Sequence, residues 1–302
     1  MSAFGLCCAT FGFGCSSSND GSGHAATTDG PEGGMIFTHP PQEAGTGLQP
    51  RQQPSDVLPP GFTKTDKGGM KLGAPLVNGS LPDAGPADGG VSKCGTTLLG
   101  VVRDFHPDMM NFEGVIADDR GLVDTKLGPD RKAVFVKMDP TATTSGSAAL
   151  DTFYHSVPGT NSPYLLRLWL EPNTGVLTFH SNAFFPLDGT GFGNEGNPHN
   201  YHFTTEVHTA FQYRGKETFR FLGDDDLWVF INGTLAIDLG GVHTAEPAEV
   251  DLDARANDFG IEKGRVYPLD LFHAERHTTQ SNFRLDTDLA FVDCGTIVSD
   301  VR

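Results

Sequence analysis

Three consecutive aspartates, Asp224, Asp225 and Asp226, stand between two apolar, aromatic runs, "ETFRFL" and "LWVFI". Adjacent carboxylates repel one another, and no Lys or Arg lies within three residues on either side. A bound Ca²⁺ would offset this repulsion, because calcium prefers hard carboxylate oxygens. The alternative is that the aspartates only shape a turn, where Asp is common. The triplet is therefore a candidate calcium site.

A second candidate metal site contains His273, Glu275 and His277, which share one face of an expected strand at a period of two. Imidazole and carboxylate both bind zinc, and His243 is a conceivable further ligand. The motif lacks the helical His-Glu-x-x-His spacing of many zinc sites. A buried polar network, in which His273 and Glu275 hydrogen-bond each other and Arg276, is therefore the preferred interpretation.

Familiar catalytic motifs are not found in the sequence. It contains no Gly-x-Ser-x-Gly nucleophile elbow, and the Gly-rich stretch 187–193 lacks the Lys-Ser/Thr ending of a phosphate loop. The formal net charge is −17, and residues 94–302 carry 16 basic and 30 acidic residues. Such a surface repels nucleic acid and anionic membranes but suits cations. We expect a binding protein that is not an enzyme.

The elements that must position these side chains are short, aromatic and β-branched, and turn residues separate them. Asn232-Gly233 predicts a hairpin, because a type I′ turn needs φ > 0 at both central residues. Pro172 to Gly175 marks a second hairpin. No window shows sustained helical periodicity, so the predicted fold class is all-β, a sandwich or barrel. The expected strands are 164–171, 176–182, 217–222, 227–231, 234–239 and 265–273.

Composition divides the chain into three parts. Residues 1–15 are apolar and uncharged, and residues 1–93 together hold 28 Gly plus Pro. A segment this poor in apolar side chains cannot offset its ordering entropy, so residues 16–93 are predicted to be a disordered stalk or linker. Dense Phe, Leu and Val begin at Cys94, and residues 94–296 are long enough for one domain with a sizeable core.

The cysteines fall in two groups. Residues 1–15 resemble the end of a bacterial lipoprotein signal, with Cys15 as the lipidated residue, and a cleaved signal peptide is the alternative. Cys94 and Cys294 bracket the dense region. Their placement predicts a disulfide and an oxidising compartment, with two unrelated free thiols as the alternative.

Several long motifs resemble the fibro-slime domain, which belongs to the wider group of PA14-like β-sandwich domains. They occur in the family's order over residues 97–292. The resemblance implies an extracellular domain of the kind found in slime, matrix and adhesion proteins. The motifs are "VVRDF" (101–105), "FFPLDGTGFG" (184–193), the run 200–244 around the aspartates, and "YPLDLFHAERHTTQSNFRLDT" (267–287).

The resemblance also implies a set of site residues. In PA14-like lectins, two consecutive aspartates joined by a cis peptide bond hold Ca²⁺, which coordinates vicinal hydroxyls of a sugar. Asp224 and Asp225 take this place, and the loop 276–282 takes the place of the second loop that completes the shell. The predicted metal ligands are Asp224, Asp225, Gln280 and Asn282, and the predicted ligand-binding residues are Asp226, His277, Thr278, Thr279 and Ser281.

The function that the resemblance implies is calcium-dependent carbohydrate binding in adhesion, by a secreted or surface-tethered domain. The expected partners are glycans or extracellular polysaccharide. Contact with a membrane is expected only through an N-terminal lipid anchor, as in a bacterial outer-membrane lipoprotein. The alternative is a structural slime-matrix protein whose calcium only stabilises the fold.

Overall fold

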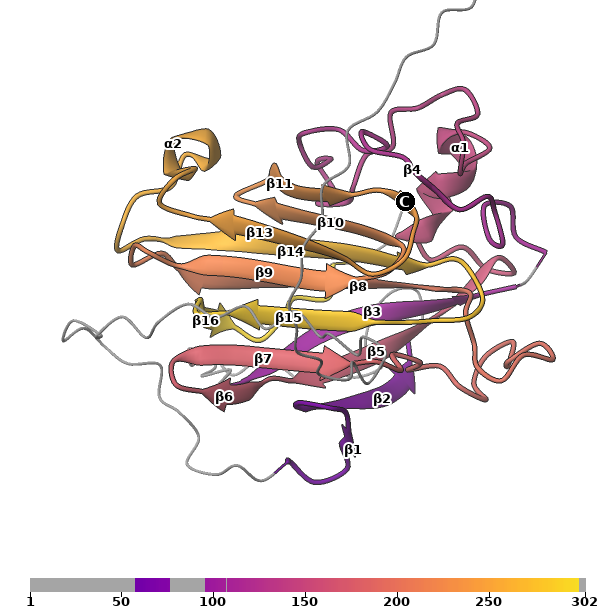
Figure 1. Ribbon diagram of the computed structural model, residues 1–302, viewed down its shortest axis with the longest axis horizontal. Coiled ribbons are helices and arrows are strands. Elements are labelled where there is room, and N and C mark those ends of the chain that lie inside the picture. Colours follow the sequence, from indigo (N-terminus) through magenta and orange to yellow (C-terminus); the bar gives the residue numbers. More distant parts are fainter. Residues whose placement is uncertain (1–57, 77–95, 107, 299–302) are drawn as a thin grey trace, which may run out of the picture. The chain divides into compact units, whose positions relative to one another are not determined.

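Short strands pair into two main antiparallel sheets in the computed structural model (Figure 1). The structure describes residues 58–76, 96–106 and 108–298. By internal contacts the chain splits at residue 43, and all of the described residues belong to the second unit, 44–302. The all-β prediction is confirmed, since the helices of the described residues are single turns: α1 (Ser147–Leu150), the 3-10 helix η1 (Asp151–Phe153) and α2 (Ala256–Phe259).

The larger sheet has nine strands, and its order differs from the order of the sequence. Strand β16 (Ala290–Asp293) lies off the main path and pairs with β8. The path runs β1 (Thr63–Lys64), β2 (Gly69–Pro75), β5 (Asn161–Trp169), β3 (Thr97–Phe105), β8 (Phe203–Gln212), β14 (Val266–Glu275), β10 (Asp226–Ile231), β11 (Thr234–Leu239).

The smaller sheet has five strands and faces the larger one across the main hydrophobic core. A separate two-stranded ribbon pairs β4 (Ala117–Asp118) with β12 (Gly241–Val242). The order of the smaller sheet is β13 (Glu246–Asp251), β9 (Thr218–Gly223), β15 (Phe283–Thr287), β7 (Val176–Ser181), β6 (Glu171–Asn173).

Strand β10 shows why its sequence, "DLWVFI", is apolar at nearly every position. Leu227, Val229 and Ile231 lie in the core between the two sheets. Trp228 and Phe230 point to the opposite face, where a second core packs them under residues 105–154. Side chains alternate between the faces of a strand, so a strand that is buried on both faces needs apolar residues throughout. The segment that covers the second core includes β4 and α1 in Figure 1.

The predicted hairpins are confirmed. Ile231 pairs with Thr234 across Asn232 and Gly233, which have φ of 50° and 71°. Positive φ at both central residues is what the type I′ turn requires. Asn173 likewise pairs with Val176 across a two-residue turn. All six predicted strands are present, with ends that shift by a few residues.

The predicted start of the folded region is corrected by the structure. Residues 58–76 were expected in the stalk, but β2 pairs with β5 and extends the larger sheet. Met70 and Leu72 pack against the main core. Without β2 the long strand β5 would be an exposed edge, which proteins tend to cover. Residues 1–57 and 77–93, which hold the rest of the predicted stalk and Cys15, lie outside the described residues.

Cys294 follows β16 and is disulfide-bonded. Cys94 lies outside the described residues, so its pairing with Cys294 stays a prediction. Cys294 accepts a backbone hydrogen bond from Leu99 of β3 (2.6 Å), which holds the end of the domain against its first long strand. No helix among the described residues has the length and apolarity needed to span a membrane.

A buried charge network fastens the segment 106–155 to the larger sheet. Glu206 of β8 is fully buried and accepts hydrogen bonds from Lys132 Nζ (2.7 and 2.9 Å) and from Arg103 Nη2 (3.2 Å). The two cations hold the pKa of the Glu206 carboxyl well below its usual range, although burial acts in the opposite direction. The carboxylate thus stays ionised between two buried cations.

We predict that Glu206→Gln destabilises the domain by about 3–5 kcal/mol, because it removes the buried carboxylate to which Lys132 and Arg103 donate. Urea unfolding measures the change. The matched control is Glu262→Gln, which removes a carboxylate from the exposed pair with Arg265. It should change the unfolding free energy by less than about 0.5 kcal/mol. Equal effects of the two substitutions would contradict the assigned role of Glu206.

Candidate functional site

Asp224 and Asp225 lie where the chain passes from one sheet to the other. Strand β9 belongs to the five-stranded sheet and ends at Gly223, whereas β10 belongs to the nine-stranded sheet and begins at Asp226. Asp225 has a φ of 50°, a value that few residues other than Gly adopt but that Asp tolerates. The crossing places both aspartates at one end of the sandwich, between the two layers.

The carboxylate of Asp224 is held by one residue of the predicted second loop. The backbone N–H of Asn282 donates to Asp224 Oδ1 (2.6 Å), and the side-chain amide of Asn282 donates to Oδ2 (2.7 Å). Asn282 was predicted as a metal ligand. The structure brings it to the site, but its amide nitrogen faces Asp224, so it orients the carboxylate.

Among the described residues, the carboxylate of Asp225 accepts hydrogen bonds from two backbone N–H groups. Arg276 N–H donates to Oδ2 (2.6 Å) and His243 N–H donates to Oδ1 (3.2 Å). Burial raises the pKa of Asp225 to about 7, and the nearby charge of Asp226 adds to that rise while Arg276 opposes it. Burial also raises the pKa of Asp224, against the hydrogen bonds from Asn282. Both groups are more than nine-tenths buried.

Asp226 has a different place from the one predicted. It was expected to meet the ligand, but it is fully buried and its carboxylate is paired with the guanidinium of Arg276. Arg276 Nη2 donates to Oδ1 (3.0 Å), and Gly241 N–H donates to the same oxygen (2.8 Å). Because the first residue of β10 points into the second core, Asp226 lies beneath the site and supports it.

A small cavity of about 50 Å³ joins the aspartates to the predicted loop. Its lining contains Asp224 and Asp225 together with the run 277–280, so four of the predicted loop residues reach it: His277, Thr278, Thr279 and Gln280. Thr279 and Gln280 are exposed, whereas the aspartates are buried. The cavity thus has carboxylates at its inner end and neutral polar groups at its outer end.

Ser281 is the predicted loop residue that does not face the cavity. It is 1% exposed, and its hydroxyl donates to the carbonyl of Phe184 (2.9 Å). Its assignment as a ligand-binding residue is therefore corrected. The side chain turns inward because β15 begins two residues later and draws the chain back into the main core.

Other residues of the site were not predicted. Ile116, Val242, His243 and Thr244 also line the cavity. Glu113 fixes the loop, because it accepts hydrogen bonds from the backbone N–H and the hydroxyl of Thr278 (2.9 and 3.1 Å). No sequence pattern marks residues 113–116 as part of the site, since the β4–β12 ribbon brings them there from over a hundred residues away.

His273 and Glu275 do not form the hydrogen-bonded network that the sequence favoured. Both are buried, and neither side chain hydrogen-bonds the other. Arg276 pairs with Asp226 instead. Phe184, Phe203 and Phe283 surround the His273 ring, so burial lowers its pKa to about 3. The predicted network, in which His273 and Glu275 hydrogen-bond each other and Arg276, was thus wrong.

Glu275 adds a third buried carboxyl beside the aspartate pair. Burial raises its pKa well above the usual range, and the charges of Asp225 and Asp224 raise it further. Hydrogen bonds from Ser281 and from the backbone of His277 oppose this rise only in part. Buried carboxyls of this kind are stabilised by a proton or by a nearby cation.

Carboxylates and neutral oxygens of the kind that calcium accepts line the cavity. Within the ranges that the structure describes, no group of three or more His, Cys, Asp or Glu side chains is arranged to hold a metal ion. A cation here would be held by the two carboxylates of Asp224 and Asp225 and completed by neutral oxygens of residues 277–280. Calcium takes six to eight such hard oxygen ligands, including water.

A family model for the PA14 domain matches residues 188–300. The matched segment contains both aspartates and the loop 276–282, whereas residues 106–155 precede it. PA14 domains occur in extracellular and surface proteins and often serve carbohydrate binding or adhesion. They are generally binding modules without catalytic activity, although they are also found in glycosidases.

Two relatives come from Dictyostelium discoideum. Protein psiR is 36% identical over 217 residues, which cover 65% of this chain and 21% of psiR. Protein psiD is 39% identical over 206 residues, which cover 63% of this chain and 39% of psiD. The chain thus spans about a fifth to two fifths of these relatives. They give no support to the bacterial lipoprotein interpretation of Cys15.

Among the solved structures found by comparison is the PA14 domain of the MpAFP antifreeze protein. It is 10% identical, with a TM-score of 0.29, and the match covers 71% of this chain and 94% of that chain. The family model and the all-β architecture agree with the PA14-like resemblance seen in the motifs: residues 188–300 match the PA14 domain family.

Proposed function

We propose that the domain is a calcium-dependent carbohydrate-binding module that serves adhesion or attachment to extracellular matrix. One observation carries the proposal: Asp224, Asp225 and residues 277–280 line the same cavity although some fifty residues separate them in sequence. The two aspartates are the residues that would hold Ca²⁺. When bound, the ion supplies coordination positions that vicinal hydroxyls of a sugar can occupy.

Residues around the cavity would orient both the carboxylates that hold calcium and the bound saccharide. Asn282 fixes the Asp224 carboxylate through two hydrogen bonds, and the backbone N–H groups of His243 and Arg276 fix that of Asp225. Such preorganisation lowers the entropy that binding must offset. On the outer side, Gln280 and the Thr279 hydroxyl are exposed at the cavity and suit hydrogen bonds to a saccharide.

The ligand is expected to be neutral or weakly charged. Residues 94–302 carry 16 basic and 30 acidic residues, so the surface repels polyanionic polysaccharides and nucleic acid. Ile116 is 63% exposed at the rim of the cavity and offers an apolar contact to the apolar face of a sugar ring. Extracellular placement, a Cys94–Cys294 disulfide and tethering through Cys15 belong to this proposal.

The alternative function is a structural matrix protein in which calcium only stabilises the fold. The exposure of Thr279 and Gln280 beside the buried aspartates favours the binding function, because a purely structural site would be closed by protein oxygens. A glycan array with and without EGTA tests the choice. Binding that EGTA abolishes supports the proposal, whereas no glycan binding by a protein that is calcium-loaded and folded would favour the structural role.

We predict that Asp225→Asn removes calcium binding without unfolding the domain. The substitution lowers the number of charged ligands, on which calcium affinity depends. The Asn amide can accept only one of the two backbone hydrogen bonds from Arg276 and His243, so the metal-free protein should lose about 1–3 kcal/mol of stability but stay folded. Calorimetric titration with Ca²⁺ and thermal unfolding measure the two effects. Unchanged calcium affinity in Asp225→Asn would sink the mechanism.

The matched control is the neighbouring substitution Asp226→Asn. It breaks the buried pair with Arg276, so it should destabilise the fold by about 3–5 kcal/mol, both with and without calcium. Asp225→Asn should therefore act mainly on calcium affinity, whereas Asp226→Asn should act mainly on the free energy of unfolding. If Asp226→Asn left the unfolding free energy unchanged, the supporting role of Asp226 would have to be abandoned.

We also predict that calcium affinity falls as the pH falls below about 7. The pKa of Asp225 is raised from 3.8 to about 7, so the metal-free folded state binds a proton that the unfolded state releases. Its stability should therefore decrease as the pH rises from about 4 to 7. Calcium must displace this proton, which lowers its affinity by up to about tenfold per pH unit below 7.

Calcium titrations and metal-free thermal unfolding between pH 5 and 8 check this prediction. Asp118→Asn, at an exposed position of β4, is the control and should keep the pH dependence of the parent. A calcium affinity that does not change across this range would show that Asp225 is already ionised in the metal-free protein.

A further inference from the structure

His202 lies between the side chains of two glutamates that come from distant parts of the chain. Its Nδ1 is 3.0 Å from Glu195 Oε2, and its Nε2 is 3.1 Å from Glu113 Oε1. The side chains of His202 and Glu195 are 5% and 12% exposed, so water competes little for these contacts. The histidine thus joins the segment that holds Glu113 to the chain just after the Gly-rich stretch 187–193.

Both contacts are hydrogen bonds when the imidazole carries a proton on each nitrogen. Ionised carboxylates only accept hydrogen bonds, and a neutral imidazole has one N–H to donate. The imidazolium form donates to both glutamates and balances part of their charge. Phe112 meets the ring edge to face. Asp104, whose pKa burial raises to about 6, is close enough for the charges of Glu195 and His202 to act on it in opposite directions.

Glu113 is bound to the loop 276–282 through both its main chain and its side chain. Its backbone N–H donates to the carbonyl of Arg276 (2.8 Å), and its carboxylate accepts from the backbone N–H and the hydroxyl of Thr278 (2.9 and 3.1 Å). Thr278 is one of the residues that line the candidate calcium site. A contact that fixes the Glu113 carboxylate therefore also fixes Thr278 at the cavity.

The two glutamates share a backbone conformation that few residues other than Gly adopt. Glu113 has a φ of 54° and Glu195 a φ of 56°. Such conformations cost free energy and persist where the surrounding contacts fix them. On the Glu195 side, the Asn200 amide donates to the carbonyl of Gly193 (3.2 Å) and to Asp104 (2.7 Å). The Gly-rich stretch is thus held in shape and gives Glu195 a fixed position.

We propose that His202 is a positioning residue of the candidate site: its imidazolium ring ties Glu113 to Glu195 and so holds the loop 276–282 in place at the cavity. The Gly-rich stretch acts on the site from outside, because its effect passes through Glu195, His202 and Glu113. The effect on calcium and glycan binding rests on the proposed function, whereas the effect on the loop does not.

The NMR order parameter of the Thr278 amide, measured on the full chain without metal, tests the effect on the loop. In the parent it should have the value of rigid backbone, about 0.85, and His202→Gln should lower it below about 0.7. Val229 of β10 is the reference and should stay rigid, because its strand is paired on both sides. An unchanged Thr278, or an equal fall at both amides, would overturn the proposal.

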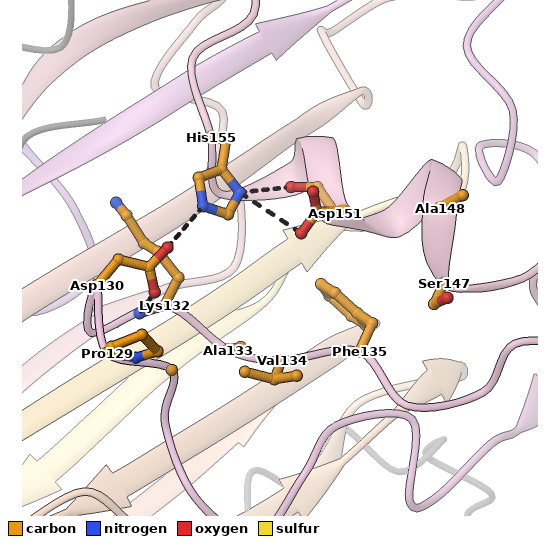
Figure 2. A pocket seen from close by; sticks show the side chains of 11 residues that line it. Pro129, Asp130, Lys132, Ala133, Val134, Phe135, Ser147, Ala148, Asp151 and His155 are labelled. Carbon is orange, nitrogen blue, oxygen red and sulfur yellow. Dashed lines mark hydrogen bonds and ion pairs between the residues drawn. The ribbon is translucent and has the colours of Figure 1, made fainter. Parts of the chain in front are cut away.

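His155 provides the matched control, because it too lies between two acidic residues. It lines a larger cavity, of about 360 Å³, beside α1 (Figure 2). Its Nε2 is 3.1 Å from Asp130 Oδ2, and its Nδ1 is 2.6 Å from the carbonyl oxygen of Asp151. The residues that line this cavity are separate from the loop 276–282. His155→Gln should therefore leave the order parameter of Thr278 unchanged, and an equal fall in both variants would refute the role of His202.

Glu195→Gln is a milder second variant, since it leaves His202 in place and removes the charge that holds the ring from the far side. It should also lower the order parameter of Thr278, and thermal unfolding confirms that each variant is folded. In the parent, both ring N–H protons of His202 should give NMR signals at about pH 6, because hydrogen bonds protect them from solvent exchange. A signal from only one of them would contradict the imidazolium link.

Calcium titration connects this result with the proposed function. If the parent binds calcium, His202→Gln should bind it at least about threefold more weakly, because the loop must then be ordered on binding. A lower order parameter with unchanged calcium affinity would overturn the assignment of His202 as a positioning residue of the site. Absence of calcium binding by the parent would count against the proposed function alone, since the order parameter still decides whether His202 holds the loop.

Discussion

The buried ion pair between Asp226 and Arg276 connects the parts of the structure on which the candidate site depends. Both side chains are fully buried, and the guanidinium also donates to the carbonyl of Thr143 (2.9 Å). Arg276 belongs to the loop that follows β14, and its own N–H donates to Asp225. One cation thus fastens the first residue of β10, the segment 106–155 and the second loop of the site. A buried charge of this kind is tolerated only with its partner, which makes the arrangement sensitive to either residue.

The nine-stranded sheet is covered on both faces, and this explains where the polar chemistry can occur. Its one face packs on the smaller sheet and its other face on residues 105–154. Polar groups inside such layers need partners, as Glu206 has with Lys132. Glu275 lies at the end of β14 beside the aspartate pair, and burial together with the charges of Asp225 and Asp224 raises its pKa well above the usual range. Several buried carboxyls thus gather at this end of the sandwich.

The two cavities rest on different parts of the fold. The smaller one forms where β9 crosses to β10, a feature of the segment that matches the PA14 model. The larger one forms within the segment 106–155, which precedes that match and whose basic residues are bound to the sheet.

The sequence by itself determined the all-β class and the hairpins at Asn232-Gly233 and Thr174-Gly175, because strand periodicity and turn chemistry are local properties. The pairing of Asp224 and Asp225 with the loop 276–282 followed from the order of the family motifs. It could not determine the direction of single side chains. Asp226 and Ser281 turn inward because β10 and the approach to β15 are buried, and Ile116 reaches the cavity only because β4 pairs with β12. The strand β2 within the predicted stalk was missed for the same reason: its apolar content is low, and only the open edge of β5 gives it a partner. Contacts between distant segments decide burial, and burial decides which carboxylates are free to bind.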